Sequence, residues 1–297
     1  EAGDFLLLTG PTGCGKSTLL KTLNGLIPHE SGGSLTGQVL VGGTDTQGCS
    51  IAQLSRMVGM VFQSPDDQIF STTVFDETAF ILENMGLSGD EICLRAEEAL
   101  AWVGLPEKRN ASVHTLSGGQ KQRLALASVL AAKPRILALD EPISQLDPQG
   151  ADALLSVLRS VNQILGTTVI IVEHRLHEVM PLCRKVAIMD RGRLIWQGSR
   201  QEAYRQPELF QALGLRLPQT VSICRQLDVT PRSESIADAA AAIRRQYHIS
   251  VWEKQEHSAA VHRDEPSVSP AVQVENLSFR YTPGKGPLVL DDINLTI

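Results

Sequence analysis

The sequence of 297 residues is poor in aromatic residues and has no long apolar run. Aromatic residues make up 4% of the chain and hydrophobic residues 42%, so the expected core is mainly aliphatic. No apolar run approaches the roughly 18 residues that a membrane-spanning helix needs. The net charge of −6 lacks the basic excess that nucleic-acid-binding proteins show, which argues against a nucleic-acid partner.

Cysteine is also scarce, and a methionine start is missing. The five cysteines are odd in number and scattered without metal-ligand spacing, which predicts free thiols in a reducing cytoplasm; they are Cys14, Cys49, Cys93, Cys183 and Cys224. The chain begins at Glu1 and shows no signal peptide. We therefore expect the sequence to be a fragment of a longer protein.

Short apolar runs alternate with helical patterns over the first 200 residues. This alternation predicts an α/β fold with a mainly parallel sheet and helices on its faces. We expect strands over residues 5–9, 38–41, 57–62, 135–139, 168–173, 185–189 and 193–198. We expect helices over residues 17–26, 74–102 with a break at 86–89, 117–131 and 150–165.

A phosphate-binding loop follows the first expected strand and opens the first expected helix. It matches the pattern G-x-x-x-x-G-K-[ST], in which glycines turn backbone N–H groups toward phosphate oxygens. Lys16 is expected to reach the β- and γ-phosphates, and Ser17 to ligate Mg²⁺. The predicted nucleotide-binding residues here are Gly10, Pro11, Thr12, Gly13, Cys14, Gly15, Lys16, Ser17 and Thr18. The motif alone leaves kinase, GTPase, motor and transporter open.

Two carboxylates, Asp140 and Glu141, end the buried strand 135–139. Successive strand residues point to opposite sides, so the two should have separate roles. Asp140 is suited to hold Mg²⁺ through water, and Glu141 to polarise an attacking water. The alternative is an acidic strand end that caps the next helix.

A second anion-binding helix start lies about 100 residues after the first. Ser117 begins the helix, Gly118 and Gly119 allow close backbone approach, and Gln120 follows. One nucleotide does not need two such cradles from one subunit. A head-to-tail pair does, because each ATP would lie between one domain's phosphate loop and its partner's Ser117–Gln120 segment.

These motifs and their order resemble the ATP-binding cassette (ABC) ATPases. Gln63 matches the Q-loop, residues 144–147 match the D-loop with Asp147 at its end, and His174 matches the switch histidine. The resemblance implies a P-loop NTPase ABC-type nucleotide-binding domain with a small β-subdomain and a helical subdomain around residues 74–131. It further implies hydrolysis of ATP with Ser17, Gln63 and Asp140 organising Mg²⁺. Glu141 would be the base, His174 would contact the γ-phosphate, and a second ABC domain would be the partner.

Among ABC proteins, the chain looks most like the ATPases of energy-coupling-factor (ECF) importers. The segment Gln63–Phe70 is similar to the groove that receives coupling helices of their transmembrane T component, where Asp66 and Asp67 would suit basic helices. The resemblance implies a peripheral location on the cytoplasmic face of the membrane and an indirect partner, the membrane subunit that binds a vitamin or metal ion. A chromosome or repair ATPase would carry a long coiled coil between the Q-loop and Leu116, and an exporter would carry fused membrane spans. This sequence shows neither feature. A soluble tandem ABC regulator without a membrane partner stays open as the alternative.

The chain is expected to divide into four parts. Residues 1–200 resemble an ABC ATPase domain without its first strands, and 201–246 a small helical extension with helices at 201–213 and 233–245. Residues 247–270 form the expected linker. Residues 271–297 resemble the first strands of a second, truncated ABC domain, with Tyr281 as the candidate to stack on adenine. The alternative is that this tail folds back onto the first domain.

Overall fold

The computed structural model describes residues 1–229, 235–247, 273–279 and 290–296. The chain divides into two compact units, Glu1–His248 and Ile249–Ile297. No helix in these described ranges is long and apolar enough to cross a membrane.

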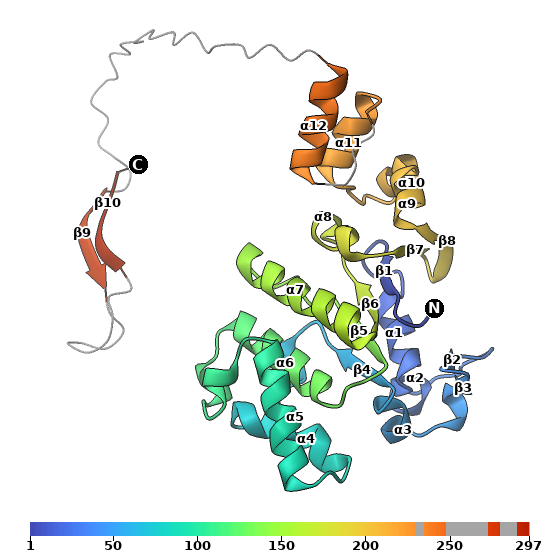
Figure 1. Cartoon of the computed structure of the whole chain (residues 1–297), viewed down its shortest axis with the longest axis vertical. Coiled ribbons are helices and arrows are strands. Elements are labelled where there is room, and N and C mark those ends of the chain that lie inside the picture. Colours follow the sequence, from blue (N-terminus) through green and yellow to red (C-terminus); the bar gives the residue numbers. More distant parts are fainter. Residues whose placement is uncertain (230–234, 248–272, 280–289, 297) are drawn as a thin grey trace. The chain divides into compact units, whose positions relative to one another are not determined.

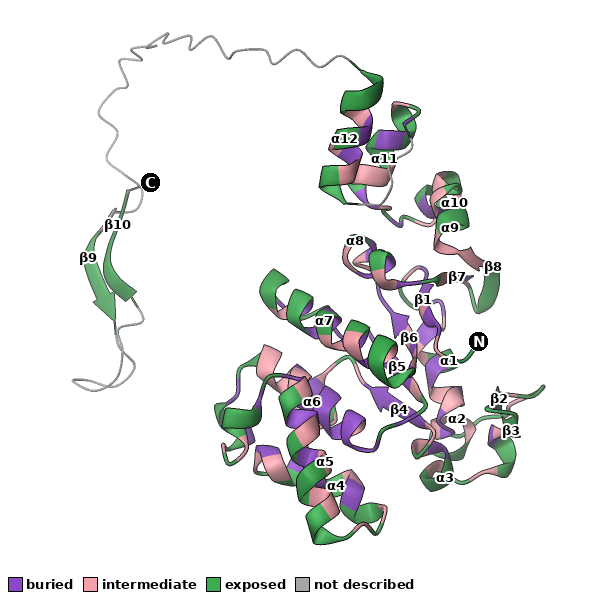
Figure 2. Cartoon of the chain, in the orientation of Figure 1, coloured by how far each residue is buried: buried purple, intermediate pink, exposed green. Residues whose placement is uncertain are grey.

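A six-stranded sheet forms the centre of the larger unit (Figure 1). The strand order is β4-β5-β6-β1-β7-β8, and all neighbours are parallel except β7 and β8. The inner strands are mostly buried (Figure 2), which is the reason that they read as continuous apolar runs in the sequence. The strands are β1 Phe5–Thr9, β4 Val58–Val61, β5 Ile136–Asp140, β6 Thr168–Val172, β7 Lys185–Asp190 and β8 Arg193–Ser199. Their parallel course brings the carboxyl ends of β1, β4, β5 and β6 to one edge.

The helices that follow these strands begin and end where the sequence places caps. α7 (Pro148–Leu165) starts with Pro148 after the N-cap Asp147, and it ends at Gly166 in the left-handed conformation. It buries one apolar stripe, from Ala151 to Val161. The other helices of this part are α1 Lys16–Leu23 and the short α2 Leu26–His29, α3 Ile51–Ser55 and α8 Leu176–Val179.

Three helices form a compact group between residues 74 and 131, as the sequence predicts. They are α4 Val74–Asn84, α5 Gly89–Trp102 and α6 Gly118–Ala131. Each starts at a hydroxyl residue whose side chain caps the helix; these are Thr73, Ser88 and Ser117. Their buried faces share one core with the sheet, so this group is anchored to the nucleotide-binding core.

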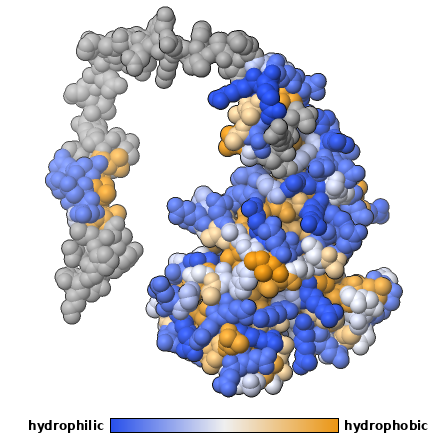
Figure 3. Space-filling model, in the orientation of Figure 1, coloured by the Kyte–Doolittle hydropathy of each residue, from blue (hydrophilic) through white to orange (hydrophobic). Residues whose placement is uncertain are grey.

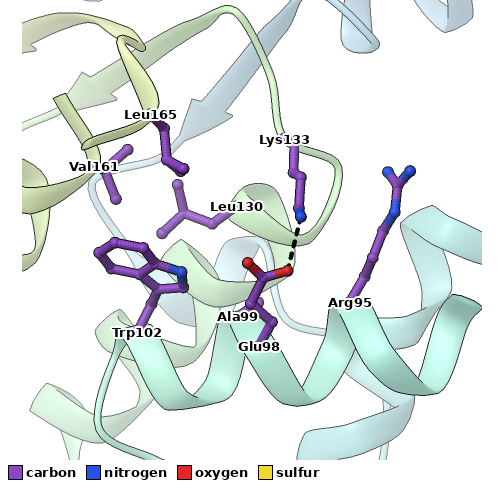
Figure 4. Close-up of a pocket in the computed structure, with 8 residues that line it drawn as sticks. All are labelled: Arg95, Glu98, Ala99, Trp102, Leu130, Lys133, Val161 and Leu165. Atoms are coloured by element: carbon purple, nitrogen blue, oxygen red, sulfur yellow. Dashed lines mark ion pairs between the residues drawn. The ribbon is translucent and has the colours of Figure 1, made fainter. Parts of the chain in front are cut away.

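The carboxyl half of α7 closes the helical group on one side (Figure 4). Trp102, Leu130, Val161 and Leu165 surround a cavity of about 10 Å³, which is room for one water molecule. Lys133 forms an ion pair of 2.7 Å with Glu98 at its rim.

Beyond residue 200 the structure departs from the expected helices. The single helix expected over 201–213 is two, α9 (Arg200–Tyr204) and α10 (Pro207–Ala212). The break falls at Gln206, because the residue before a proline is disfavoured in the α conformation. α11 (Gln219–Gln226) was not predicted, and α12 (Ile236–Gln246) begins after its cap Ser235. These helices belong to the same compact unit as the sheet.

Two small antiparallel pairs complete the described structure. β2 (Leu40–Val41) pairs with β3 (Thr44–Asp45) in the larger unit, as part of the expected β-subdomain. In the smaller unit, β9 (Gln273–Phe279) pairs with β10 (Leu290–Thr296). Ile293 faces Leu277 and Leu290 faces Phe279, so hydrophobic side chains gather on one side of this hairpin (Figure 3). Tyr281 and nearly all of the expected linker lie outside the described residues, and the assignment of this hairpin to a second ABC domain stays a prediction.

Candidate functional site

The phosphate loop between β1 and α1 has the backbone geometry of an anion cradle. Gly10, Gly13 and Gly15 have positive φ angles of 151°, 77° and 102°, a range that favours glycine. At Gly10 an added Cβ atom would lie 2.0 Å from the Met189 carbonyl oxygen, so a side chain does not fit. Gly15 caps α1 without a side chain, which leaves the first N–H groups of the helix able to bind an anion.

Lys16 holds its ammonium group inside the bend of this loop. Its Nζ donates hydrogen bonds of 2.9 Å to the carbonyl oxygens of Gly10 and Pro11, and it lies 3.9 Å from Cys14 Sγ. Thr12 and Thr18, the remaining predicted residues of the loop and first turn, are exposed. The cradle therefore combines free backbone donors with one buried cation, the combination that phosphate groups require.

Ser17 and Asp140, two of the three predicted magnesium ligands, lie next to each other. The Ser17 hydroxyl donates a hydrogen bond of 3.0 Å to Asp140 Oδ1. Burial raises the pKa of the Asp140 carboxyl, and the hydrogen bond from Ser17 opposes that rise. A divalent cation beside these oxygens would favour the ionised carboxylate, so the pair fits Mg²⁺. Gln63, the third predicted ligand, contacts Glu141 instead.

The carboxylate of Glu141, which follows β5, contacts side chains that follow the two neighbouring strands β4 and β6. Its Oε2 accepts a hydrogen bond of 3.0 Å from Gln63 Nε2, and its Oε1 lies 3.1 Å from His174 Nε2. Glu141 has a φ of 49°, a left-handed conformation that costs a residue with a side chain about 1–3 kcal/mol. This turn separates its carboxylate from that of Asp140. The two carboxylates thus have different neighbours, and their catalytic roles stay predictions.

The Ser117–Gln120 segment lies at the start of α6, on the helical group rather than beside the phosphate loop. Ser117 Oγ accepts from the Gln120 N–H at 3.3 Å, and Gln120 Oε1 accepts from the Ser117 N–H at 3.0 Å. This reciprocal capping box fixes the helix start, while Gly118 is exposed and Gly119 is partly buried. Asp147 caps α7 through a hydrogen bond of 2.9 Å from the Gly150 N–H. Both sets of side chains therefore have structural roles here, and their contact with a partner's nucleotide stays a prediction.

A groove lies beside residues 63–70, the segment predicted to receive a coupling helix, which we call the docking segment. Its volume is about 250 Å³, and most of its lining is apolar, including Met60, Phe62, Phe70, Phe80 and Ile81. Phe70 is 61% exposed, and its ring meets that of Phe80 edge to face with centroids 4.4 Å apart. Asp66, expected to attract a basic helix, is paired with Lys121 of α6 at 2.6 Å. Asp67 is exposed, so the free acidic charge expected at this segment is smaller than the sequence indicates.

Several residues that support the site were missed by sequence reasoning. Glu77 is buried and accepts the N–H groups of Phe70 and Ser71 at 3.1 and 2.9 Å, which fixes the end of the docking segment. Glu173 and Arg175 flank His174, and their side chains bind the backbone that follows Glu141. For Glu173 and Arg175, the only sequence signal is that a charged residue stands on each side of the predicted switch histidine.

Comparison with known proteins places this site in a family. The model of the ABC transporter family matches residues 1–144. An ABC transporter ATP-binding protein of Pyrococcus abyssi is 43% identical over 82% of this chain and 90% of its own length. The chain belongs to the family of ABC transporter ATP-binding proteins. Relatives in Pyrococcus horikoshii and Saccharolobus solfataricus carry the same description.

Solved structures show the same fold for this ABC protein. CbiO1 of Clostridium perfringens, described as part of the ABC transporter complex CbiONQ, is 34% identical over 76% of this chain and 88% of its own, with a TM-score of 0.63. The dimeric ATP-binding cassette MJ0796, in a post-hydrolysis state with ADP and phosphate, is 27% identical with a TM-score of 0.59 over 67% of this chain and 87% of its own.

Some relatives of this ABC protein are much longer than the described chain. A relative in Methanosarcina acetivorans is 51% identical over 82% of this chain, and one in Methanosarcina mazei is 43% identical over 100% of this chain. The chain spans only 38% and 52% of these two relatives.

Proposed function

We propose that this chain binds ATP with Mg²⁺ and hydrolyses it to ADP and phosphate, as the motor of a membrane importer. The arrangement of Glu141 between Gln63 and His174 carries the proposal, because it holds one carboxylate at the edge of the phosphate cradle with two polar partners. The similarity to an ADP- and phosphate-bound cassette supports it.

In the proposed hydrolysis, some residues of the site bind the nucleotide and Mg²⁺, and others take part in proton transfer. Lys16 and the N–H groups of the phosphate loop bind the β- and γ-phosphates. Ser17 and Asp140 would hold Mg²⁺ with Gln63, and the ion would neutralise phosphate charge when bound. Glu141 takes a proton from the attacking water, and His174 keeps the Glu141 carboxylate oriented and contacts the γ-phosphate.

The second half of each nucleotide site comes from a partner domain. Family members pair, as the dimeric cassette shows, and the Ser117–Gln120 segment here is free to meet a nucleotide held by another domain. Gly118 is exposed and Gly119 is partly buried at a helix N-terminus, where backbone N–H groups can reach phosphate oxygens. We propose a second ABC domain as this partner, with Asp147 and the rest of the D-loop at the interface.

The groove beside the docking segment is the proposed contact with a T-type membrane component. An apolar lining with two exposed aromatic rings suits an amphipathic coupling helix laid into it. This would place the chain on the cytoplasmic face of the membrane, and a separate membrane subunit would bind the solute, such as a vitamin or metal ion. The likeness to CbiO1 supports an ECF-type importer.

Purification from detergent-solubilised membranes tests the importer. We expect the tagged full chain to retain a polytopic membrane protein when expressed with its neighbouring genes. A chain that hydrolyses ATP but elutes with ribosomes, or without any membrane protein, would support the soluble regulator instead. A chain that binds no ATP would overturn both.

A further inference from the structure

Glu173, which the proposed hydrolysis does not use, is a buried carboxylate at the end of β6. Its side chain is 1% exposed. Oε1 accepts a hydrogen bond of 3.0 Å from the Ile143 N–H, and Oε2 accepts one of 3.1 Å from the His174 N–H. A carboxylate is costly to bury, and these charge-assisted hydrogen bonds offset part of that cost. Glu173 therefore joins the backbone of the switch histidine to the backbone two residues beyond Glu141.

Arg175 holds the same backbone from the other side of His174. Its Nη1 donates hydrogen bonds of 2.9 Å to the Ile143 carbonyl and 3.0 Å to the Leu146 carbonyl. Its Nε donates to Glu178 Oε1 at 3.0 Å, which fixes the guanidinium plane. The N–H of Ile143 is thus bound by Glu173 and its carbonyl by Arg175. We call these two residues the clamp.

The clamp closes a ring of contacts that includes the predicted base. Ile143 lies between Glu141 and the D-loop, residues 144–147. Glu141 contacts His174 through its carboxylate, and its carbonyl accepts the Ser144 hydroxyl at 2.8 Å. A shift of the D-loop therefore has to move the Ile143 peptide, and the clamp passes that movement to the backbone on both sides of His174.

A purely structural role would need fewer bonds than this. One buried acceptor would satisfy the Ile143 N–H, and one donor would satisfy the Ile143 carbonyl. Instead both charged side chains bind the single segment that links the base to the D-loop. They do so from the two positions adjacent in sequence to the histidine that contacts the base.

We infer that Glu173 and Arg175 are positioning residues that couple the D-loop to the contact between Glu141 and His174. Engagement of the D-loop by a partner domain would then set how well the base is oriented in the same chain. The inference rests on the proposed ATP hydrolysis by a paired domain, and it adds the residues through which pairing controls the chemical step.

Steady-state hydrolysis by the full chain tests the clamp. In Glu173→Gln an amide N–H must face a backbone N–H, and in Arg175→Ala two carbonyls lose their donor. For both variants we expect kcat to fall at least tenfold while KM for MgATP stays within about twofold of the wild-type value. Hydrogen exchange in the peptide 141–147 should become faster in both.

The control is Asp4→Asn, which also removes a buried carboxylate, here one paired with Lys185 at 2.8 Å at the other end of β1. It should lower the melting temperature without changing kcat. Faster exchange at 141–147 with unchanged kcat in the clamp variants would show that the clamp is only structural and overturn the inference. Absence of turnover in the wild type and in Asp4→Asn would instead overturn the proposed function, and these two results are distinguishable.

Discussion

Glu141 Oε1 lies 3.1 Å from His174 Nε2, although the two residues are 33 positions apart. They come together because β5 and β6 are parallel neighbours, so the residues that follow each strand meet at the same edge of the sheet. Gln63, which follows β4 on the other side of β5, reaches the second oxygen of the same carboxylate. The order β4-β5-β6 thus explains why one carboxylate has two polar partners.

Replacement of Glu141 by Gln should remove the base and keep the shape of the site. We expect kcat to fall by about 10²–10⁴, the usual contribution of a positioned base, while ATP binding stays near the wild-type level. Because ATP would persist, the paired state should accumulate on gel filtration with MgATP. Turnover near the wild-type rate would contradict the assignment of Glu141, whatever the oligomeric state.

The local parts of this site could be predicted from the sequence. The phosphate loop needs glycines at fixed positions in a strand–loop–helix context, and apolar runs mark β1, β5 and β6 within one or two residues. The Ser17–Asp140 and Glu141–His174 contacts followed from a family resemblance that places these residues in one site.

Contacts that depend on tertiary packing could not be predicted. Asp66 reads as a free acidic residue, and only the packing of α6 shows that Lys121, 55 positions away, pairs with it. Glu173 reads as one residue of a strand end, and its partner is the main chain of Ile143, which has no sequence signal. The break at Gln206 is different, because Pro207 is a sequence signal for a helix break. The helical pattern on both sides of Pro207 nevertheless led to the prediction of one continuous helix.

The Ser17–Asp140 pair predicts a specific dependence on magnesium. Asp140→Asn removes the charge that a divalent cation needs, and Ser17→Ala removes the neighbouring oxygen. We expect each to raise the Mg²⁺ concentration for half-maximal hydrolysis by at least tenfold. Because the two groups are hydrogen-bonded, the double variant should show less than the product of the single effects. Full multiplicativity would show that the two oxygens do not share one ion.

The groove beside the docking segment predicts a membrane-partner defect that is separate from catalysis. Phe70→Ser removes an aromatic ring that is 61% exposed and lines the groove. Leu94→Ser is the matched control, since Leu94 is 68% exposed on α5 and does not line it. We expect Phe70→Ser to reduce co-purification of the membrane component at least fivefold and Leu94→Ser to leave it unchanged. Equal retention by both variants would place the docking surface elsewhere.

Glu173 predicts how the stability of the folded chain depends on pH. Burial raises the pKa of its carboxyl to about 7 from an ordinary 4.5, against the backbone hydrogen bonds that it accepts and with the nearby Glu141 charge adding to the rise. The folded state therefore keeps a proton that the unfolded state has lost. The associated stability is fully present below pH 4.5 and is lost as pH rises through 7.

Urea unfolding at pH 5 and pH 8 measures this effect against Glu173→Gln, which has no such group. Glu141, His174 and Arg175, the other charged or titratable residues around Glu173, are present in both proteins, so the comparison isolates the Glu173 carboxyl. We expect the free energy of unfolding of the wild type to fall by about 2–3 kcal/mol more than that of the variant, because one pKa unit corresponds to about 1.4 kcal/mol. Parallel pH curves for the two proteins would mean that Glu173 is ionised throughout this range, so that its carboxylate keeps the charge with which it binds the Ile143 and His174 amides.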